Sequence, residues 1–198
     1  MTSIITGDII NSRGQDANDW LTELKSQLAL YGETPKQWEV YRGDSFQIEL
    51  PLKDALKAAI LIKASLKQFK TIDVRLAIGI GEKTYDADHI TESNGSAFIN
   101  SGECFEQLKK TNLAVKSGRT EFDIPINIML ELALITMNTW TPTTASLVKL
   151  ALTKPEANQI ELAELTQSTQ GNISQGLKRA GYDEILKMIQ YYTKNVQP

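Results

Sequence analysis

Cysteine and histidine are almost absent from this sequence of 198 residues, which contains only Cys104 and His89. A single cysteine excludes a disulfide framework, and one cysteine with one histidine cannot build a zinc cluster. We therefore expect both residues to be structural rather than reactive. Disulfide-stapled proteins and Cys/His zinc proteins are excluded as classes.

A long apolar stretch is also lacking, since no segment is long and apolar enough to span a bilayer. The first ten residues include an apolar run, but no basic segment precedes it and Asp8 interrupts it. This pattern indicates a strand rather than a signal peptide. The expectation is a cytoplasmic protein that does not associate with a membrane.

The chain has no strong excess of charge of either sign. Its formal net charge is -3, which argues against a basic surface that coats nucleic acid. The distribution is uneven, however, because residues 141–198 contain six basic and five acidic side chains, a net +1. The net negative charge therefore lies in residues 1–140.

The apolar pattern of the first 81 residues predicts the element order β-α-β-β-α-β. Helices are recognised by apolar residues at helical spacing and strands by period-two alternation, here with a hairpin turn at Gly43-Asp44. This order is the ferredoxin-like split βαβ arrangement, in which both helices cover one face of an antiparallel sheet and the other face is free. The predicted elements are a strand at 3–10, a helix at 18–31, strands at 38–42 and 45–50, a helix from Pro51 to Phe69, and a strand at 74–80.

The next segment predicts a helix over 95–110, a strand at 113–116 and a helix that begins at Asp123. This last helix is apolar on much of its circumference, so it is expected to be buried or to join two units. The sequence Thr141-Pro-Thr-Thr is the best candidate for a boundary. We therefore predict two domains, residues 1–140 and residues 141–198.

The C-terminal segment has the pattern of a helix-turn-helix, with short helices over 159–165 and 172–181 joined by a polar turn. The predicted fold class is thus α+β, with the ferredoxin-like domain followed by a small all-α domain. The alternative is a helical bundle that only packs against the first unit. Side chains that could reach DNA phosphates and base edges, most effectively in a homodimer, are Ser168, Gln170, Asn172, Gln175, Lys178 and Arg179.

Two aspartates at predicted strand ends, Asp8 and Asp44, are candidate ligands for Mg²⁺. The predicted topology brings the end of the first strand close to the hairpin, and the Ile9 carbonyl could add a third hard oxygen ligand. The alternative is that both aspartates only cap turns. Candidate nucleotide contacts around them are Asn11, Ser12, Arg42 and Gly43, together with Arg75, which is expected to face either a ligand or an ion-pair partner.

Several of these motifs resemble the core of class III nucleotide cyclases and the related diguanylate cyclases. Asp8-Ile9 and Gly43-Asp44 match the two metal-aspartate positions of those families, and Arg75 to Gly81 is similar to the strand that follows. A weaker match is Gly95 to Asn100, which implies a substrate-orienting role for Asn100. The spacing to Asn100 is one residue too long, and Cys104 stands where the families have an arginine.

Over nearly the whole chain, the motifs ITGDIINSR, YRGDSFQ, RLAIGIG and GSAFINSG, followed by a terminal helix-turn-helix, resemble the SatD family of bacterial proteins. The resemblance implies a cytoplasmic protein with a C-terminal region like that of DNA-binding proteins. The function expected is that of a DNA-binding regulator with a domain that senses a nucleotide or a metal. The alternatives are a Mg²⁺-dependent nucleotide cyclase or nucleotidyltransferase-like enzyme, and a structural adaptor without a ligand.

Overall fold

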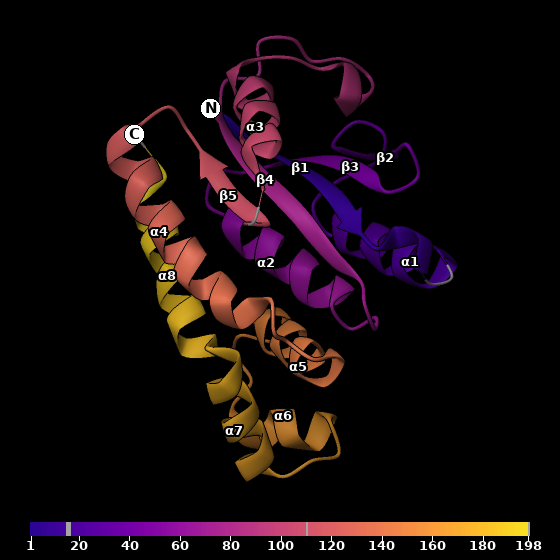
Figure 1. Ribbon diagram of the computed structural model, residues 1–198, viewed down its shortest axis with the longest axis vertical. Coiled ribbons are helices and arrows are strands. Elements are labelled where there is room, and N and C mark those ends of the chain that lie inside the picture. The colour runs from indigo at the N-terminus through magenta and orange to yellow at the C-terminus, as the bar shows by residue number, and fades with distance from the viewer. Residues whose placement is uncertain (15–16, 110, 198) are drawn as a thin grey trace.

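The computed structural model describes residues 1–14, 17–109 and 111–197, and in them the chain forms an α+β fold around a five-stranded sheet (Figure 1). The strand order is β2-β3-β1-β4-β5, with antiparallel pairing except between β4 and β5, which are parallel. The predicted order β-α-β-β-α-β is confirmed, as is the strand at 113–116. The strands are β1 (Thr2–Ile10), β2 (Trp38–Tyr41), β3 (Ser45–Leu50), β4 (Asp73–Gly81) and β5 (Leu113–Lys116).

Helices α1 (Ala17–Leu28) and α2 (Ala55–Leu66) cover one face of the sheet. Most apolar positions of the strands point to this face, and Trp20 and Phe46 are buried there. Helix α2 begins at Ala55 rather than at Pro51, because residues 52–54 form a turn closed by a hydrogen bond from the Asp54 amide to the Pro51 carbonyl. It is buried on nearly every side, since the sheet contacts one side of it and another helix contacts the other.

The opposite face of the sheet is not free, and this corrects the sequence-based expectation. Helix α3 (Ser96–Gln107) packs across β1, β4 and β5 on that face. The approach is close because Ala77, Gly79 and Gly81 present little or no side chain there, and a Cβ added at Gly79 would collide with the backbone of α3. The predicted range 95–110 ends at a residue outside the described part of the chain.

Helix α4 (Thr120–Met137) begins three residues before Asp123, the residue predicted to start it. Asp123 instead lies in the first turn, where its carboxylate accepts hydrogen bonds from the amides of Ser117 and Gly118 at 2.9 and 3.1 Å. A carboxylate near a helix N-terminus interacts favourably with the helix dipole. Asp123 therefore does accept backbone amides, but they belong to the loop before the helix.

The remaining helices are α5 (Pro142–Thr153), α6 (Gln159–Leu165), α7 (Gln170–Ala180) and α8 (Tyr182–Asn195). Helix α5 packs on α2, and α8 runs beside α4 along one edge of the molecule, so that α3 and the pair α6–α7 lie toward opposite ends (Figure 1). One cluster of buried apolar residues extends from the sheet into these helices. The boundary at 140/141 stays a prediction, and the hydrophobic core is continuous across it.

Several polar contacts fix the C-terminal helices to the rest of the chain, among them hydrogen bonds from the Arg119 guanidinium to main-chain carbonyls of residues 195–197. The indole nitrogen of Trp140, between α4 and α5, donates to the Ala180 carbonyl at 3.1 Å. Lys149 of α5 forms an ion pair with Glu23 of α1 at 2.8 Å. Within the described residues, the chain has no helix with the length and hydrophobicity needed to cross a membrane.

Candidate functional site

Asp8 and Asp44 lie at the same end of two neighbouring strands. Antiparallel pairing places Asp8 of β1 opposite Ser45 of β3, and the Ile9 amide donates to the Asp44 carbonyl at 3.0 Å. The predicted convergence of the two residues therefore occurs. It follows from the pairing of β3 with β2 on one side and with β1 on the other, which brings the turn before β3 beside the end of β1.

The Asp8 carboxylate is held by two side chains from the neighbouring strands. The Arg75 guanidinium of β4 donates to one carboxylate oxygen at 2.6 Å, and the Ser45 hydroxyl donates to the other at 3.3 Å. Arg75 also stacks over the Phe105 ring of α3, 5.3 Å from its centroid. Arg75 thus takes the ion-pair role, one of the two expected for it. A cation at Asp8 must compete with this guanidinium.

Asp44 is bound by the loop that follows β1. The Ser12 hydroxyl, in the short 3₁₀ turn Ser12–Gly14, donates to the Asp44 carboxylate at 2.7 Å. Gly43 has a φ of 91° and open space where a Cβ would be, so the backbone there can be approached by a ligand. Arg42 is exposed beside it, at a φ of 54°.

Asn11 and Asn100, two of the predicted nucleotide contacts, form hydrogen bonds to main-chain carbonyls. The side chain of Ile9, a predicted metal ligand through its carbonyl, points away from the site. The Asn11 amide donates to the Thr71 carbonyl at 2.9 Å, and the Asn100 amide donates to the Ile80 carbonyl at 2.8 Å. The Ile9 side chain is buried in the core, so only its main chain reaches the site. The structure therefore places Asp8 with Arg75 and Ser45, and Asp44 with Ser12, at adjoining strand ends.

The polar row beside Asp8 includes residues that the sequence interpretation missed. Ser45 is one of them, and Gln47 is another, with its amide 3.4 Å from the Thr6 hydroxyl. Thr6 is in turn 3.0 Å from the Ser101 hydroxyl of α3. The period-two alternation of β3 could have identified Ser45 and Gln47, because every second residue of that strand shares the face of Asp8.

The loop between β4 and α3 borders this row. His89 has its Nδ1 3.0 Å from a Glu39 carboxylate oxygen, and Thr91 donates to the same carboxylate at 2.7 Å. The hydrogen bond with Glu39 raises the pKa of His89. Lys83 forms an ion pair with Glu49 at 2.7 Å. These contacts fix the loop against β2 and β3.

The site offers few hard ligands for a metal ion. Asp8 and Asp44 supply two carboxylates, and substrate phosphates complete the shell of Mg²⁺ in many proteins. In the described parts of the chain, no group of three or more His, Cys, Asp and Glu side chains is placed to hold a metal. A cation bound here would need further oxygen ligands, such as those of a phosphate.

The second candidate surface is α7 with the turn before it. The helix buries Ile173, Leu177 and Ala180 and begins at Gln170, with the Thr169 hydroxyl accepting from the Asn172 amide at 3.2 Å. Ser168 therefore lies in the turn rather than in the helix. All six predicted DNA contacts are exposed, namely Ser168, Gln170, Asn172, Gln175, Lys178 and Arg179.

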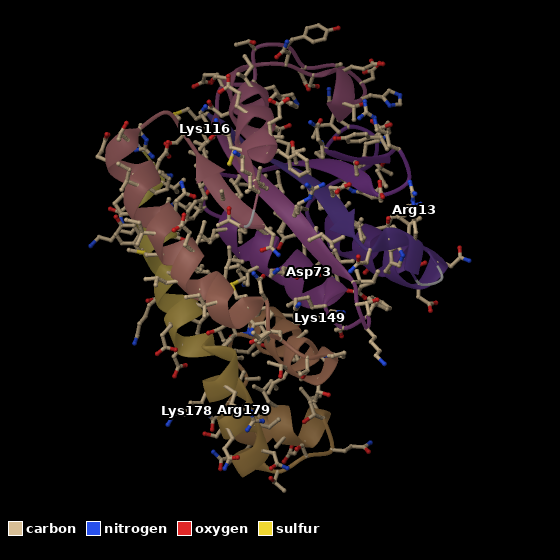
Figure 2. The ribbon with its side chains drawn as sticks, viewed as in Figure 1. Arg13, Asp73, Lys116, Lys149, Lys178 and Arg179 are labelled. Carbon is tan, nitrogen blue, oxygen red and sulfur yellow. The ribbon has the colours of Figure 1, made fainter. Side chains whose placement is uncertain are left out.

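The charge around α7 is mixed. Lys178 and Arg179 lie in the last turn of α7, at the end of the molecule away from α3 (Figure 2). Glu161 and Glu164 are exposed on the neighbouring α6. The Gln170 amide donates to Gln159 of α6 at 2.7 Å, which connects the two helices at the surface. The basic part of the surface is therefore confined to one helix end.

Comparison with known proteins returned no match of any kind: no protein-family model, no curated protein and no solved structure is similar to this chain.

Proposed function

We propose that this protein is a cytoplasmic DNA-binding regulator with a nucleotide-binding domain, and that Asp8 and Asp44 bind Mg²⁺ together with the nucleotide phosphates. The observation that carries the proposal is the position of the two aspartates on adjoining strand ends, joined by the hydrogen bond from Ile9 to Asp44. The open space at Gly43 gives a phosphate access to this position. Arg75, which donates to Asp8 in the absence of a ligand, is the candidate to neutralise phosphate charge.

The strand order supports a ferredoxin-like, nucleotide-cyclase-like domain. In the split βαβ arrangement the first strand lies between the third and the fourth, as β1 lies between β3 and β4. The resemblance to the cyclases and to the SatD family remains a prediction. It agrees with two aspartates that come together from distant motifs.

Two side chains of α3 favour nucleotide binding over catalytic turnover. Asn100, whose counterpart orients substrate in the cyclases by resemblance, is hydrogen-bonded to the Ile80 carbonyl. Cys104, at the position of the family arginine, is buried, and burial raises the pKa of its thiol to about 11. A neutral buried thiol cannot supply the positive charge of an arginine, and one N–H of the Asn100 amide is already used by Ile80. A Mg²⁺-dependent enzyme is the second candidate function, because both aspartates are present and adjacent.

Mg²⁺-dependent nucleotide binding is expected to disappear in the double variant Asp8→Asn with Asp44→Asn, because two of the hard oxygen ligands lose their charge. In the parent protein, a ligand at about 100 times its Kd adds about 2.7 kcal/mol of stability. For a chain of this size that raises Tm by roughly 5–10 °C. A thermal-shift screen of nucleoside mono-, di- and triphosphates, with and without Mg²⁺, measures the shift, and calorimetry then gives the affinity.

Asp183→Asn is the matched control, since it removes one exposed carboxylate from α8, far from β1 and β3. It should leave the Mg²⁺-dependent shift intact. A parent protein that binds no nucleotide, or a double variant that binds as well as the parent, would reject the site. Release of pyrophosphate on incubation with a triphosphate would shift the assignment to the enzyme.

The C-terminal part of the proposal concerns DNA. Helices α6 and α7 have the order and the connecting turn of a helix-turn-helix, and the exposed face of α7 carries amide and basic side chains. Two basic residues supply a small electrostatic contribution. We therefore propose that DNA is bound by two copies, each contributing one α7.

The double variant Lys178→Ala with Arg179→Ala is expected to weaken DNA binding at least about tenfold at low salt, because two phosphate contacts are lost. The slope of log K against log salt concentration should fall by about 2. A gel-shift titration at several salt concentrations measures both quantities. Lys53→Ala with Lys109→Ala removes the same charge from exposed positions outside α7.

Equal weakening by the two pairs of substitutions would mean that only net charge matters. Failure of the parent protein to retain DNA at low salt would remove DNA from the proposal. If nucleotide binding is absent as well, the remaining function is that of a structural adaptor.

A further inference from the structure

A groove with a volume of about 660 Å³ lies between the first turns of α5 and one side of α7. We call it the α5–α7 groove. The two helices are close together at its base, because Gly176 leaves room for Leu147; an added Cβ would lie 2.6 Å from the Leu147 side chain. Most of the other residues that line the groove are polar, including Thr143, Ser146, Ser168, Asn172 and Arg179.

These five polar side chains are available to a ligand. All are exposed, and within the described parts of the chain none of them forms a hydrogen bond or an ion pair with another side chain or the main chain. Arg179 brings a positive charge, and no aspartate or glutamate is among the described residues that line the groove. Hydroxyl, amide and guanidinium donors without a carboxylate favour an anion with several acceptor oxygens.

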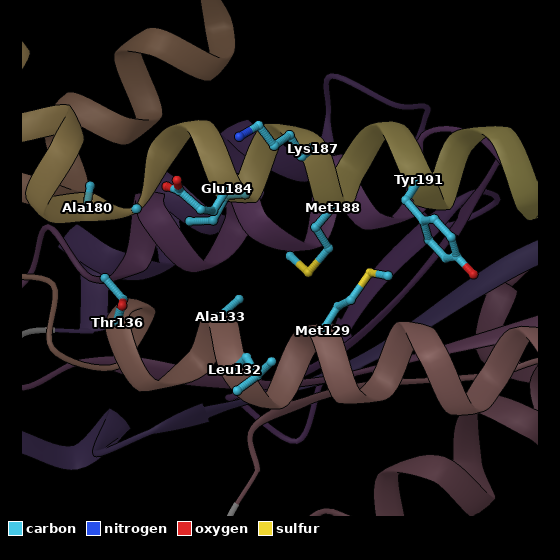
Figure 3. Close-up of a pocket in the computed structure, with 11 residues that line it drawn as sticks. Met129, Leu132, Ala133, Thr136, Ala180, Glu184, Lys187, Met188 and Tyr191 are labelled. Atoms are coloured by element: carbon cyan, nitrogen blue, oxygen red, sulfur yellow. The ribbon is translucent and has the colours of Figure 1, made fainter.

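A larger groove, between α4 and α8, does not suit an anion. It has a volume of about 710 Å³ and is lined mainly by apolar side chains, among them Met129 and Met188 (Figure 3). Its lining includes one lysine, Lys187, and one carboxylate, Glu184. A phosphate in it would lie among aliphatic and thioether groups, which solvate a charge poorly.

The α5–α7 groove adjoins the surface proposed to bind DNA. Of the six predicted DNA contacts, Ser168, Asn172 and Arg179 line the groove and the other three do not. A duplex carries a phosphate on every nucleotide of each strand. A duplex that reaches the exposed side of α7 therefore brings phosphates to the groove beside it.

We propose that the α5–α7 groove holds the sugar-phosphate backbone of one DNA strand, with Thr143, Ser146 and Arg179 donating to phosphate oxygens. The inference rests on the proposed DNA binding and adds the side of α7 that faces the backbone. Phosphate contacts fix orientation, and base contacts give specificity. Gln175, exposed outside the groove, is then left for base edges, and Lys178 for phosphates outside it.

The length of the groove fits a short run of backbone. Asn172 and Arg179 are both on α7, and their separation corresponds to about 10 Å along a helix. Successive nucleotides of one strand rise by about 3.4 Å along the duplex axis. The groove is thus long enough to contact more than one phosphate.

Ser146→Glu is expected to weaken the binding of a mixed-sequence duplex of about 30 base pairs about tenfold or more, because its carboxylate repels phosphate and competes for Arg179. A gel-shift titration at low salt measures the affinity. Gln190→Glu is the matched control, since it adds the same charge at an exposed position of α8 that lines neither groove. Both positions are exposed, so the circular dichroism of each variant should be that of the parent.

A double-mutant cycle tests whether the two sides of the groove contact the same phosphates. Arg179→Ala should weaken binding in the parent, and much less once Ser146→Glu is present, because both changes remove the same contacts. Lys178→Ala, at a position outside the groove, should reduce the affinity by the same factor in both backgrounds.

Equal affinities of Ser146→Glu and Gln190→Glu, with a parent that retains the duplex, would overturn the groove and leave DNA binding in place. Additive effects of Ser146→Glu and Arg179→Ala would assign them to different phosphates and refute a shared groove. A parent that retains no duplex at low salt would reject the proposed DNA binding itself, and this inference with it.

Discussion

The substitution Asp73→Ala is expected to lower the free energy of unfolding by about 3 kcal/mol or more, because it leaves a buried ammonium without its partner. Asp73, at the start of β4, forms ion pairs with Lys63 of α2 at 2.7 Å and with Lys67, the residue after α2, at 3.2 Å. The Lys63 side chain is 0% exposed and the Asp73 side chain is 17% exposed. Urea denaturation of the parent and the variant measures the difference.

The lowered pKa of Lys63 sets the direction in which its contribution to stability changes with pH. Burial lowers the pKa of Lys63 to about 8, and Asp73 counteracts part of that effect. The folded-state pKa lies below the unfolded value of about 10.4, so the unfolded state binds more protons between pH 8 and pH 10. The Lys63 contribution therefore makes stability rise with pH across this window.

The variant Lys63→Met is the informative partner in a double-mutant cycle. It removes the buried charge, and Lys67 still pairs with Asp73, so its stability should lie near that of the parent or above it. Adding Asp73→Ala to Lys63→Met should cost much less than Asp73→Ala alone. A loss below about 1 kcal/mol for Asp73→Ala in the parent would show that the cluster is hydrated rather than buried.

The variant Gly79→Val is expected to destabilise the fold by about 3 kcal/mol, although valine is favoured in strands. A Cβ at this position meets the backbone of Ala97 and Ser101 in α3, and backbone atoms cannot rotate away. The helix must therefore separate from the sheet. The measurement is the denaturation midpoint together with the m-value, which reports whether the native state has loosened.

Gly102→Ala is the control for this prediction. Gly102 lies on α3, the helix that packs against Gly79, and no atom comes within 4 Å of an added Cβ. The variant should therefore be as stable as the parent or gain up to about 1 kcal/mol from helix propensity. Equal stability of Gly79→Val and the parent would contradict the position of α3.

The strands could be predicted from the sequence because their signal is local. Period-two alternation in β3 and β4 identifies both the element and the residues that face the core, and the elements end within one or two residues of the predicted positions. The face of the sheet on which α3 packs could not be predicted in this way. Its amphipathic pattern predicts a helix but not a face of the sheet, and the informative signal was in β4, where Gly79 and Gly81 alternate with apolar residues.

The candidate site was predicted in part for the same reason. The split βαβ strand order specifies which strand ends meet, so the main-chain proximity of Asp8 and Asp44 follows from topology. The orientations of Asn11 and Asn100 do not, because each amide donates to a main-chain carbonyl whose position depends on the tertiary fold. The sequence leaves two alternatives for Arg75, a ligand or an ion-pair partner. The pairing of β4 with β1 shows that Arg75 binds Asp8.

Asp73 and the two lysines that pair with it, Lys63 and Lys67, also lie between the two candidate surfaces. Lys67 bridges Asp73 to the carbonyl of Asn138 at the end of α4, at 3.0 Å. Arg75, two residues along β4, holds Asp8. Asp73 and Arg75 of β4 are thus connected, through Lys67 and through Asp8, to the segment that leads into α5 and to the end of β1.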